Sequence, residues 1–175
     1  NYDRMVGLAD AAWTLLENQR LDQIKFEAVA NMVGVDQRLA LALVGSVQSL
    51  VLAKMNALDC QSILEAYDNI ADAGEVSIRE KIIEGLLHRF ETYAPFRGQI
   101  DQLNKSARRH PELAVRLLDS LDAAIRRILM ISGDPVDGLK GMLRVKGVTG
   151  VFLVTSRVWM KDDSPDLAAT MKMLD

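Results

Sequence analysis

The stretch FEAVANMVGV, Phe26–Val35, contains the pattern that decides the fold. Its apolar residues recur at the three- and four-residue spacings of an amphipathic helix, and Gly34 interrupts them. The pattern predicts a helix over 25–33, a tight turn at Gly34 and a further helix over 37–43. Asp36 is a suitable N-cap for this second helix.

Two small details of this stretch favour close packing of the two helices. Ala30 is small where helices would cross, and Val35 can fill the space beneath the turn. A helix over 3–18 precedes them, so the first fifty residues form a helix-turn-helix pattern of three short helices.

The rest of the chain carries the same helical periodicity and almost no strand signal, so we expect an all-α fold. It is a helical bundle of about nine helices. We divide it into a helix-turn-helix-like unit over 1–46 and a ligand-binding and dimerisation region over 47–175, within one compact chain. The remaining helices are expected at 46–72, 78–92, 96–109, 112–132, 136–160 and 165–174.

Several helix ends are marked by capping residues. Ser77 and Glu80 have the spacing of a capping box. Gly133 is placed to end one helix, and Asp134 to cap the next. Ser164 is placed to cap the last helix.

Length and composition describe an ordinary globular chain. The 175 residues suggest one domain, with 49% hydrophobic and 26% charged residues. The net charge of -3 argues against a general polyanion binder, and a single Cys60 excludes an intrachain disulfide. No apolar run is long enough for a membrane span. We expect a cytoplasmic protein, with peripheral contact to the inner membrane as an alternative. Because the chain starts at Asn1, we expect it to be processed or trimmed.

Few positive charges accompany the helix-turn-helix pattern. Between Ile24 and Leu50 the cations are Lys25 and Arg38, and two carboxylates offset them. A protein that neutralises few phosphates has little non-specific affinity for DNA. We therefore expect a retained but degenerate helix-turn-helix and no nucleic-acid partner.

The same stretch resembles the N-terminal domain of TetR-type regulators. Such regulators carry an aromatic residue and then a lysine at the positions of Leu41 and Val47 in this chain. The resemblance implies a TetR-like fold.

A second resemblance rests on the C-terminal half: Gly133-Asp134-Pro135, then Leu143–Val148, then Val158–Asp166, closed by Thr170 and Leu174-Asp175. This line resembles the Coq-nine-type ubiquinone-biosynthesis accessory proteins, which have a TetR-like fold. The resemblance implies a homodimer packed through the last two helices, a pocket for an isoprenoid or other apolar lipid, and a quinone-modifying hydroxylase as partner. Where eukaryotic members carry a Trp-Tyr pair, this chain has Gly141 and Met142.

Candidate pocket residues are apolar and lie on helices that could enclose a ligand. They are Leu86, Leu87, Phe90, Leu113, Leu117, Leu118, Leu121, Ile125, Leu129, Val148 and Phe152. Each is interpretable first as a core residue and second as a pocket wall. The candidates for the dimer interface are Val151, Val154, Val158, Trp159, Leu167 and Met171.

No pattern indicates catalysis. His88 and His110 have no ligand-spaced neighbour, Asp162-Asp163 is typical of solvated caps, and no phosphate-binding loop occurs. We therefore expect that the protein is not an enzyme, has no catalytic residue, and binds neither a metal nor a cofactor.

A basic cluster, Lys105-Arg108-Arg109-His110, is the strongest local charge feature. It is interpretable as the cationic last turn of a helix, or as a contact for anionic lipid or an acidic partner.

The function that these observations favour is a non-enzymatic, lipid-binding accessory protein related to ubiquinone biosynthesis. The first alternative is a TetR-family, ligand-responsive, DNA-binding transcriptional regulator. The second is a dimeric interaction scaffold that binds neither lipid nor DNA.

Overall fold

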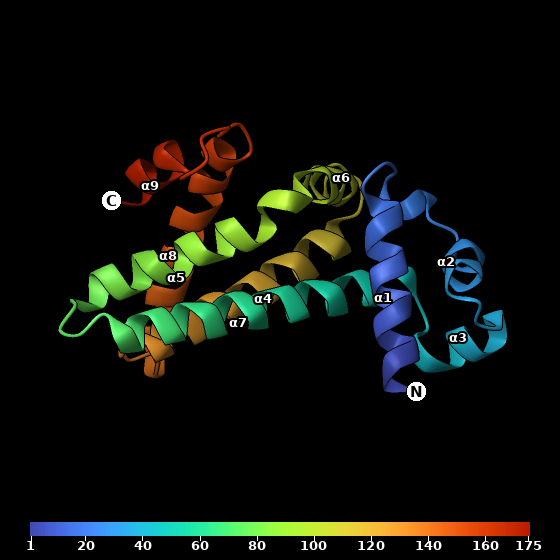
Figure 1. Cartoon of the computed structure of the whole chain (residues 1–175), viewed down its shortest axis with the longest axis horizontal. Coiled ribbons are helices and arrows are strands. Elements are labelled where there is room, and N and C mark those ends of the chain that lie inside the picture. The colour runs from blue at the N-terminus through green and yellow to red at the C-terminus, as the bar shows by residue number, and fades with distance from the viewer. The chain divides into compact units, whose positions relative to one another are not determined.

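The computed structural model describes all residues, 1–175, and contains α-helices and two short 3-10 helices (Figure 1). The all-α prediction is confirmed. The elements are α1 (Tyr2–Leu16), η1 (Leu21–Gln23), α2 (Phe26–Val33), α3 (Gln37–Val44), α4 (Val47–Asp72), α5 (Ile78–Tyr93), η2 (Ala94–Phe96), α6 (Arg97–Ala107), α7 (Pro111–Ile131), α8 (Gly138–Trp159) and α9 (Ala168–Leu174).

The helices form two compact units. Unit 1 comprises residues 1–57 and 96–117, and unit 2 comprises 58–95 and 118–175. This grouping differs from our division at residue 46, because α6 and the start of α7 belong with the N-terminal helices. The helices α4 and α7 each contribute residues to both units.

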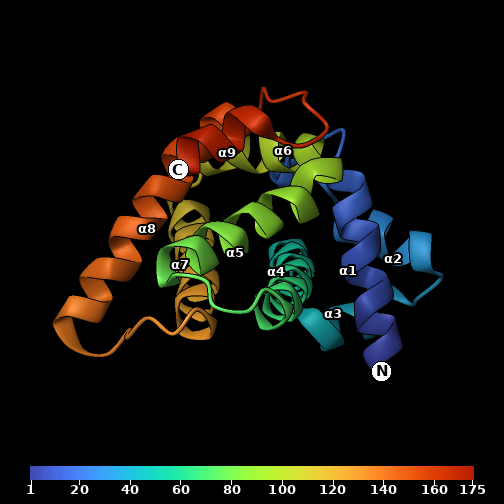
Figure 2. The same ribbon diagram turned by 60° about the vertical axis from the view of Figure 1, so that its left-hand side comes forward.

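Unit 1 is built around α1, which contacts α2, α3 and α6. Leu8, Ala12 and Leu16 are fully buried and lie one above another on a single helix face. At the C-terminal end of α1, the indole of Trp13 meets Phe96 edge to face, with ring centroids 5.6 Å apart. The amide of Gln99 donates to the Trp13 carbonyl. These contacts place α6 across the end of α1, as Figure 2 shows.

Unit 2 has an aromatic centre. Phe90 of α5 stacks on Phe152 of α8, with centroids 4.3 Å apart and planes 9° apart. The indole Nε1 of Trp159 donates to the Phe90 carbonyl at 3.1 Å. Ile125 and Leu129 of α7 are fully buried in the same unit. Because the two stacked rings come from different helices, they fix α5 against α8.

Helix ends set by local sequence lie as predicted. Gly133 has φ +84°, and its N–H and that of Asp134 donate back to Met130 and Leu129 in a Schellman motif. Ser77 and Glu80 form the capping box in both directions.

Two predicted starts are wrong. The carboxylate of Asp134 does not cap α8 but pairs with Arg144, and α8 begins at Gly138. The last helix begins at Ala168 rather than 165, because Leu167 adopts a left-handed conformation just before it.

No single helix is both long and apolar enough to cross a bilayer, and the bent pair α3 and α4 reaches the required length and composition only when its two helices are taken together.

Candidate functional site

The turn between α2 and α3 is a second Schellman motif. Gly34 has φ +69°; its N–H donates to the Asn31 carbonyl at 3.2 Å, and that of Val35 donates to the Ala30 carbonyl at 3.0 Å. A Cβ at Gly34 would meet nothing within 4 Å, so the turn needs glycine for its conformation and not for space. Ala30 and Ala40 are fully buried on the two helices. The predicted helix-turn-helix is therefore present.

The carboxylate of Asp36 fixes the start of α3. It accepts from the N–H groups of Arg38 at 2.9 Å and Leu39 at 3.2 Å, as an N-cap does. The residues of α3 that remain exposed are Gln37, Arg38, Leu39, Leu41 and Ala42. An amide and a guanidinium can read base edges, and apolar side chains can contact thymine methyl groups. This face of α3 can therefore make the contacts of a recognition helix.

The charge beside α3 is balanced. Lys25 and Arg38 are exposed, and Glu27 and Asp36 lie on the same two helices. Unit 1 as a whole carries ten Lys and Arg against eight Asp and Glu, whereas unit 2 carries eleven against sixteen. Unit 1 is thus the positive part of an acidic chain, and its excess of positive charge lies in residues 96–117, outside the helix-turn-helix.

Unit 2 contains a largely apolar pocket of about 320 Å³. Its walls come from α5, α8 and α9, and its apolar residues are Ile78, Ile82, Ile83, Leu86, Val148, Val151 and Leu174. Its polar residues are Arg79, Asp134 and Arg144. Such a combination suits a small molecule with an apolar body and an anionic group.

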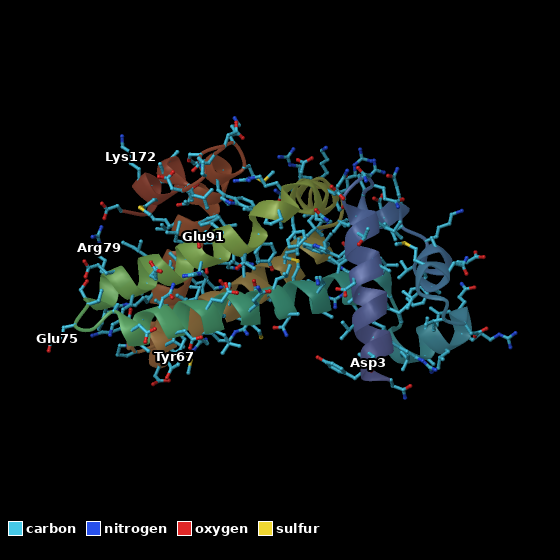
Figure 3. All side chains as sticks on the ribbon, viewed as in Figure 1. Asp3, Tyr67, Glu75, Arg79, Glu91 and Lys172 are labelled. Atoms are coloured by element: carbon cyan, nitrogen blue, oxygen red, sulfur yellow. The ribbon has the colours of Figure 1, made fainter.

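The two arginines of this pocket are both paired. Arg144 bonds the buried carboxylate of Asp134, and this bond raises the pKa of Arg144. Arg79 lies at the start of α5 and pairs with Asp175. Figure 3 shows Arg79 near the end of α9, where Lys172 also lies. Both arginines are more than half exposed and can turn toward a ligand.

The predicted pocket residues lie in different places. Leu86 and Val148 line the pocket of unit 2. Most of the other predicted pocket residues are buried in the core of unit 2: Leu87, Phe90, Leu121, Ile125, Leu129 and Phe152. Leu118 is exposed, and Leu113 and Leu117 belong to unit 1. Periodicity had marked the apolar face of α5 but could not show which of its residues border a space.

A buried ionic cluster in unit 2 was missed by the sequence analysis. Asp59 of α4 is fully buried, and its Oδ1 accepts from Arg89 Nε and from the Tyr93 hydroxyl, both at 2.9 Å. The Arg89 guanidinium also lies over the rings of Tyr93 and Phe152. Burial raises the pKa of Tyr93. Because the partners lie thirty or more residues apart, no local pattern could reveal them.

The predicted interface residues on α8 and α9 divide by exposure. Val151, Val154 and Met171 are exposed, and Val158 is half-buried. Trp159 and Leu167 are buried within unit 2 and are covered by their own chain. A partner could therefore reach only the first four. Further apolar residues of α8 are exposed beside them: Leu139, Met142, Leu143 and Leu153.

The remaining reactive side chains have ordinary partners. His88 Nε2 lies 2.7 Å from the Asn69 amide and 3.2 Å from Glu84, and His110 lies beside Glu112. The Cys60 thiol is within hydrogen-bond distance of Arg127. No set of three or more His, Cys, Asp or Glu is arranged to hold a metal ion.

Comparison with known structures identifies the fold. A TetR transcriptional regulator from Rhodococcus sp. RHA1 is similar to this chain with a TM-score of 0.64 and 14% identity, over 99% of this chain and 94% of that one. The transcriptional regulator FadR from Bacillus subtilis, in complex with stearoyl-CoA, gives a TM-score of 0.61 and 17% identity, over 99% and 96%. No family model and no curated protein matches the chain. The fold is TetR-like.

These neighbours correct our functional interpretation. They are transcriptional regulators, and nothing supports the Coq-nine-type accessory family, its isoprenoid ligand or its hydroxylase partner. The structure adds a physical reason at Gly141. A Cβ there would lie 2.1 Å from the backbone carbon of Val136, so this backbone has no room for the tryptophan of the family's Trp-Tyr pair.

Proposed function

We propose that this chain is a ligand-responsive, DNA-binding transcriptional regulator. The observation that carries the proposal is the helix-turn-helix of unit 1, in which the Schellman turn at Gly34 and the Asp36 cap leave one face of α3 exposed. The full-length similarity to TetR-family regulators supports it. Such a regulator acts in the compartment that holds the genome.

DNA recognition would depend more on base contacts than on phosphate contacts. Gln37 can bond an adenine edge and Arg38 a guanine edge or a phosphate, while Leu39 and Leu41 can contact thymine methyl groups. Lys25, at the N-terminal end of α2, is the other exposed cation nearby. With so few cations, each protomer would release few counterions, and its affinity would depend weakly on salt.

The effector would bind in the pocket of unit 2. Its apolar walls fit a hydrocarbon chain, and each buried CH₂ contributes about 0.8 kcal/mol. Arg79 and Arg144 fit a carboxylate or phosphate at the chain's end. The similar Bacillus subtilis regulator binds stearoyl-CoA, which belongs to the same chemical class of amphiphilic anions.

A homodimer would pair two helix-turn-helix units for a symmetric operator. The exposed apolar residues of α8, together with Met171 of α9, form the surface that we assign to the second copy.

The test is fluorescence anisotropy with labelled duplexes tiled across the region upstream of the protein's own gene. We expect binding to one segment, with an affinity that falls only slightly as salt rises, and about tenfold or greater weakening in Q37A/R38A. The matched control is Q61A/K161A, which removes an exposed amide and an exposed cation from unit 2. Equal affinity for every segment, or equal affinity of the two variants, would contradict the proposal.

A further inference from the structure

A second pocket lies in unit 1, with a volume of about 420 Å³. It is lined by the segment between α1 and η1, by η1, by α6 and by the turn that follows α6. Four of its side chains are cations: Arg20, Lys105, Arg108 and Arg109. The other four are amides: Asn18, Gln19, Gln23 and Gln102. It therefore has neither a carboxylate nor an apolar side chain in its lining.

The four cations are only partly neutralised by neighbouring groups. Arg20 is bonded to Asp22 by two hydrogen bonds, and this pairing lowers the pKa of Asp22. Lys105 pairs with Asp101 at 2.7 Å. Arg108 and Arg109 lie within no ion pair, and both are exposed. The guanidinium groups of Arg108 and Arg109 therefore line the pocket without a carboxylate partner.

The position of these cations at the end of α6 explains only part of the cluster. Cations in a last helical turn are favoured by the helix dipole, and this accounts for those on α6. Arg20 comes from the other side of the pocket, eighty-five or more residues away in the sequence. Asp22 offsets much of the Arg20 charge, but the unpaired charges of Arg108 and Arg109 repel each other unless an anion binds beside them.

We propose that this pocket binds a small phosphorylated ligand. Guanidinium groups match the oxygens of a phosphate in a two-bond geometry, and the amides can donate to and accept from the polar remainder of the molecule. The volume falls in the range of small-molecule sites. The site is distinct from the apolar pocket of unit 2, and it stands independently of the function proposed for that pocket.

The pocket is not placed for the DNA that α3 would bind. It lies at the C-terminal end of α1, whereas α3 lies beside the N-terminal end (Figure 1). The fifteen residues of α1 separate the two ends by about 22 Å. A convex duplex could not reach into a recessed pocket at the far end of this helix.

A ligand bound in this pocket would stabilise the junction between η1 and α6. This junction is already held by the Leu21 N–H, which donates to Ser106 Oγ at 3.1 Å in a buried position. A ligand that bridges Arg20 on one side and Arg108 on the other would add contacts across it and would be detectable as a rise in Tm.

The experiment is calorimetric titration of the full chain with inorganic pyrophosphate, with thermal unfolding in parallel. We expect one site per chain and a higher Tm in the wild type. R108Q/R109Q is expected to bind about tenfold or more weakly. The control K81Q/K161Q removes the same charge from unit 2 and is expected to bind like the wild type.

Three outcomes would overturn the proposal. They are no binding of pyrophosphate by the wild type, equal weakening in both double variants, and loss of duplex DNA affinity in R108Q/R109Q with pyrophosphate binding intact. The last would show that the cluster serves a nucleic-acid backbone. Because the duplex assay with Q37A/R38A reports on α3 alone, failure of either proposal leaves the other testable.

Discussion

Arg89 donates its Nε hydrogen to Oδ1 of Asp59 at 2.9 Å, and both side chains are buried in unit 2. The pair joins α5 to α4, and the Tyr93 hydroxyl donates to the same oxygen. The second carboxylate oxygen, Oδ2, accepts no hydrogen bond. Arg89 and Tyr93 are therefore the groups that offset the cost of burying the Asp59 carboxylate.

Removing one partner of this pair is expected to destabilise the protein strongly. Arg89→Met leaves the Asp59 carboxylate buried without its cation, which costs about 3–5 kcal/mol. Urea unfolding at neutral pH measures the loss. The double variant Asp59→Leu, Arg89→Met removes both charges and should recover much of it. A loss below about 1 kcal/mol in the single variant would be the value of a surface pair and would contradict the argument.

Two glycines of α8 should respond in opposite directions to alanine. At Gly141 a Cβ would lie 2.1 Å from the Val136 backbone, so Gly141→Ala must displace the start of α8 and lower the Tm. Gly147 has nothing within 4 Å of this position, so Gly147→Ala should stabilise the helix by about 0.5–1 kcal/mol. Thermal unfolding measures the Tm of both variants. A Tm that changes in the same direction in both would refute the prediction.

The turn before α9 should make stability depend on pH. Hydrogen bonds from Ser164 and Thr170 hold the pKa of Asp162 well below its usual range. Because the folded pKa is the lower one, this contribution is complete above about pH 4–5 and is lost as pH falls below the ordinary pKa. Asp162→Asn should lower the Tm at pH 7 and narrow its gap to the wild type near pH 2. Asp163→Asn, at the exposed neighbour, is the control.

Charge on the exposed face of α8 should block dimer formation. Val151 and Val154 are about half exposed, one turn apart on α8. A buried, unpaired glutamate at an interface is costly, so Val151→Glu, Val154→Glu should give a monomer where the wild type gives a dimer. Light scattering on a sizing column measures the mass. Leu64→Glu, on an exposed residue of α4, should leave it unchanged. A variant that remains dimeric would place the interface elsewhere.

Filling the unit 2 pocket should remove the effector response. Ile82 lines this pocket, and Ile82→Trp adds volume where the ligand chain would lie. With stearoyl-CoA as the probe, the wild type should release its duplex, whereas Ile82→Trp should bind the duplex and ignore the probe. Leu64→Trp controls for added surface tryptophan. Normal release by Ile82→Trp would show that the effector binds at another place.

The helix ends show which boundaries can be predicted from local sequence. Gly34, Asp36, the Ser77–Glu80 box and Gly133 were all identified in advance, because each acts through hydrogen bonds to residues within five positions. The starts of α8 and α9 were misplaced. At the start of α8, the Asp134 carboxylate bonds Arg144, ten residues away, and does not cap the helix. Before α9, the Asp162 carboxylate accepts a hydrogen bond from the N–H of Thr170, eight residues away.

The sequence by itself determined the all-α class, most helix boundaries and the helix-turn-helix, because periodicity and capping are local properties of the chain. Only the tertiary structure decided which apolar residues border a pocket, that Arg20 meets Arg108 and Arg109 around a recess, and that Asp59 is paired with Arg89. Those arrangements join residues on separate helices, and helix periodicity specifies a buried face without specifying what it is buried against.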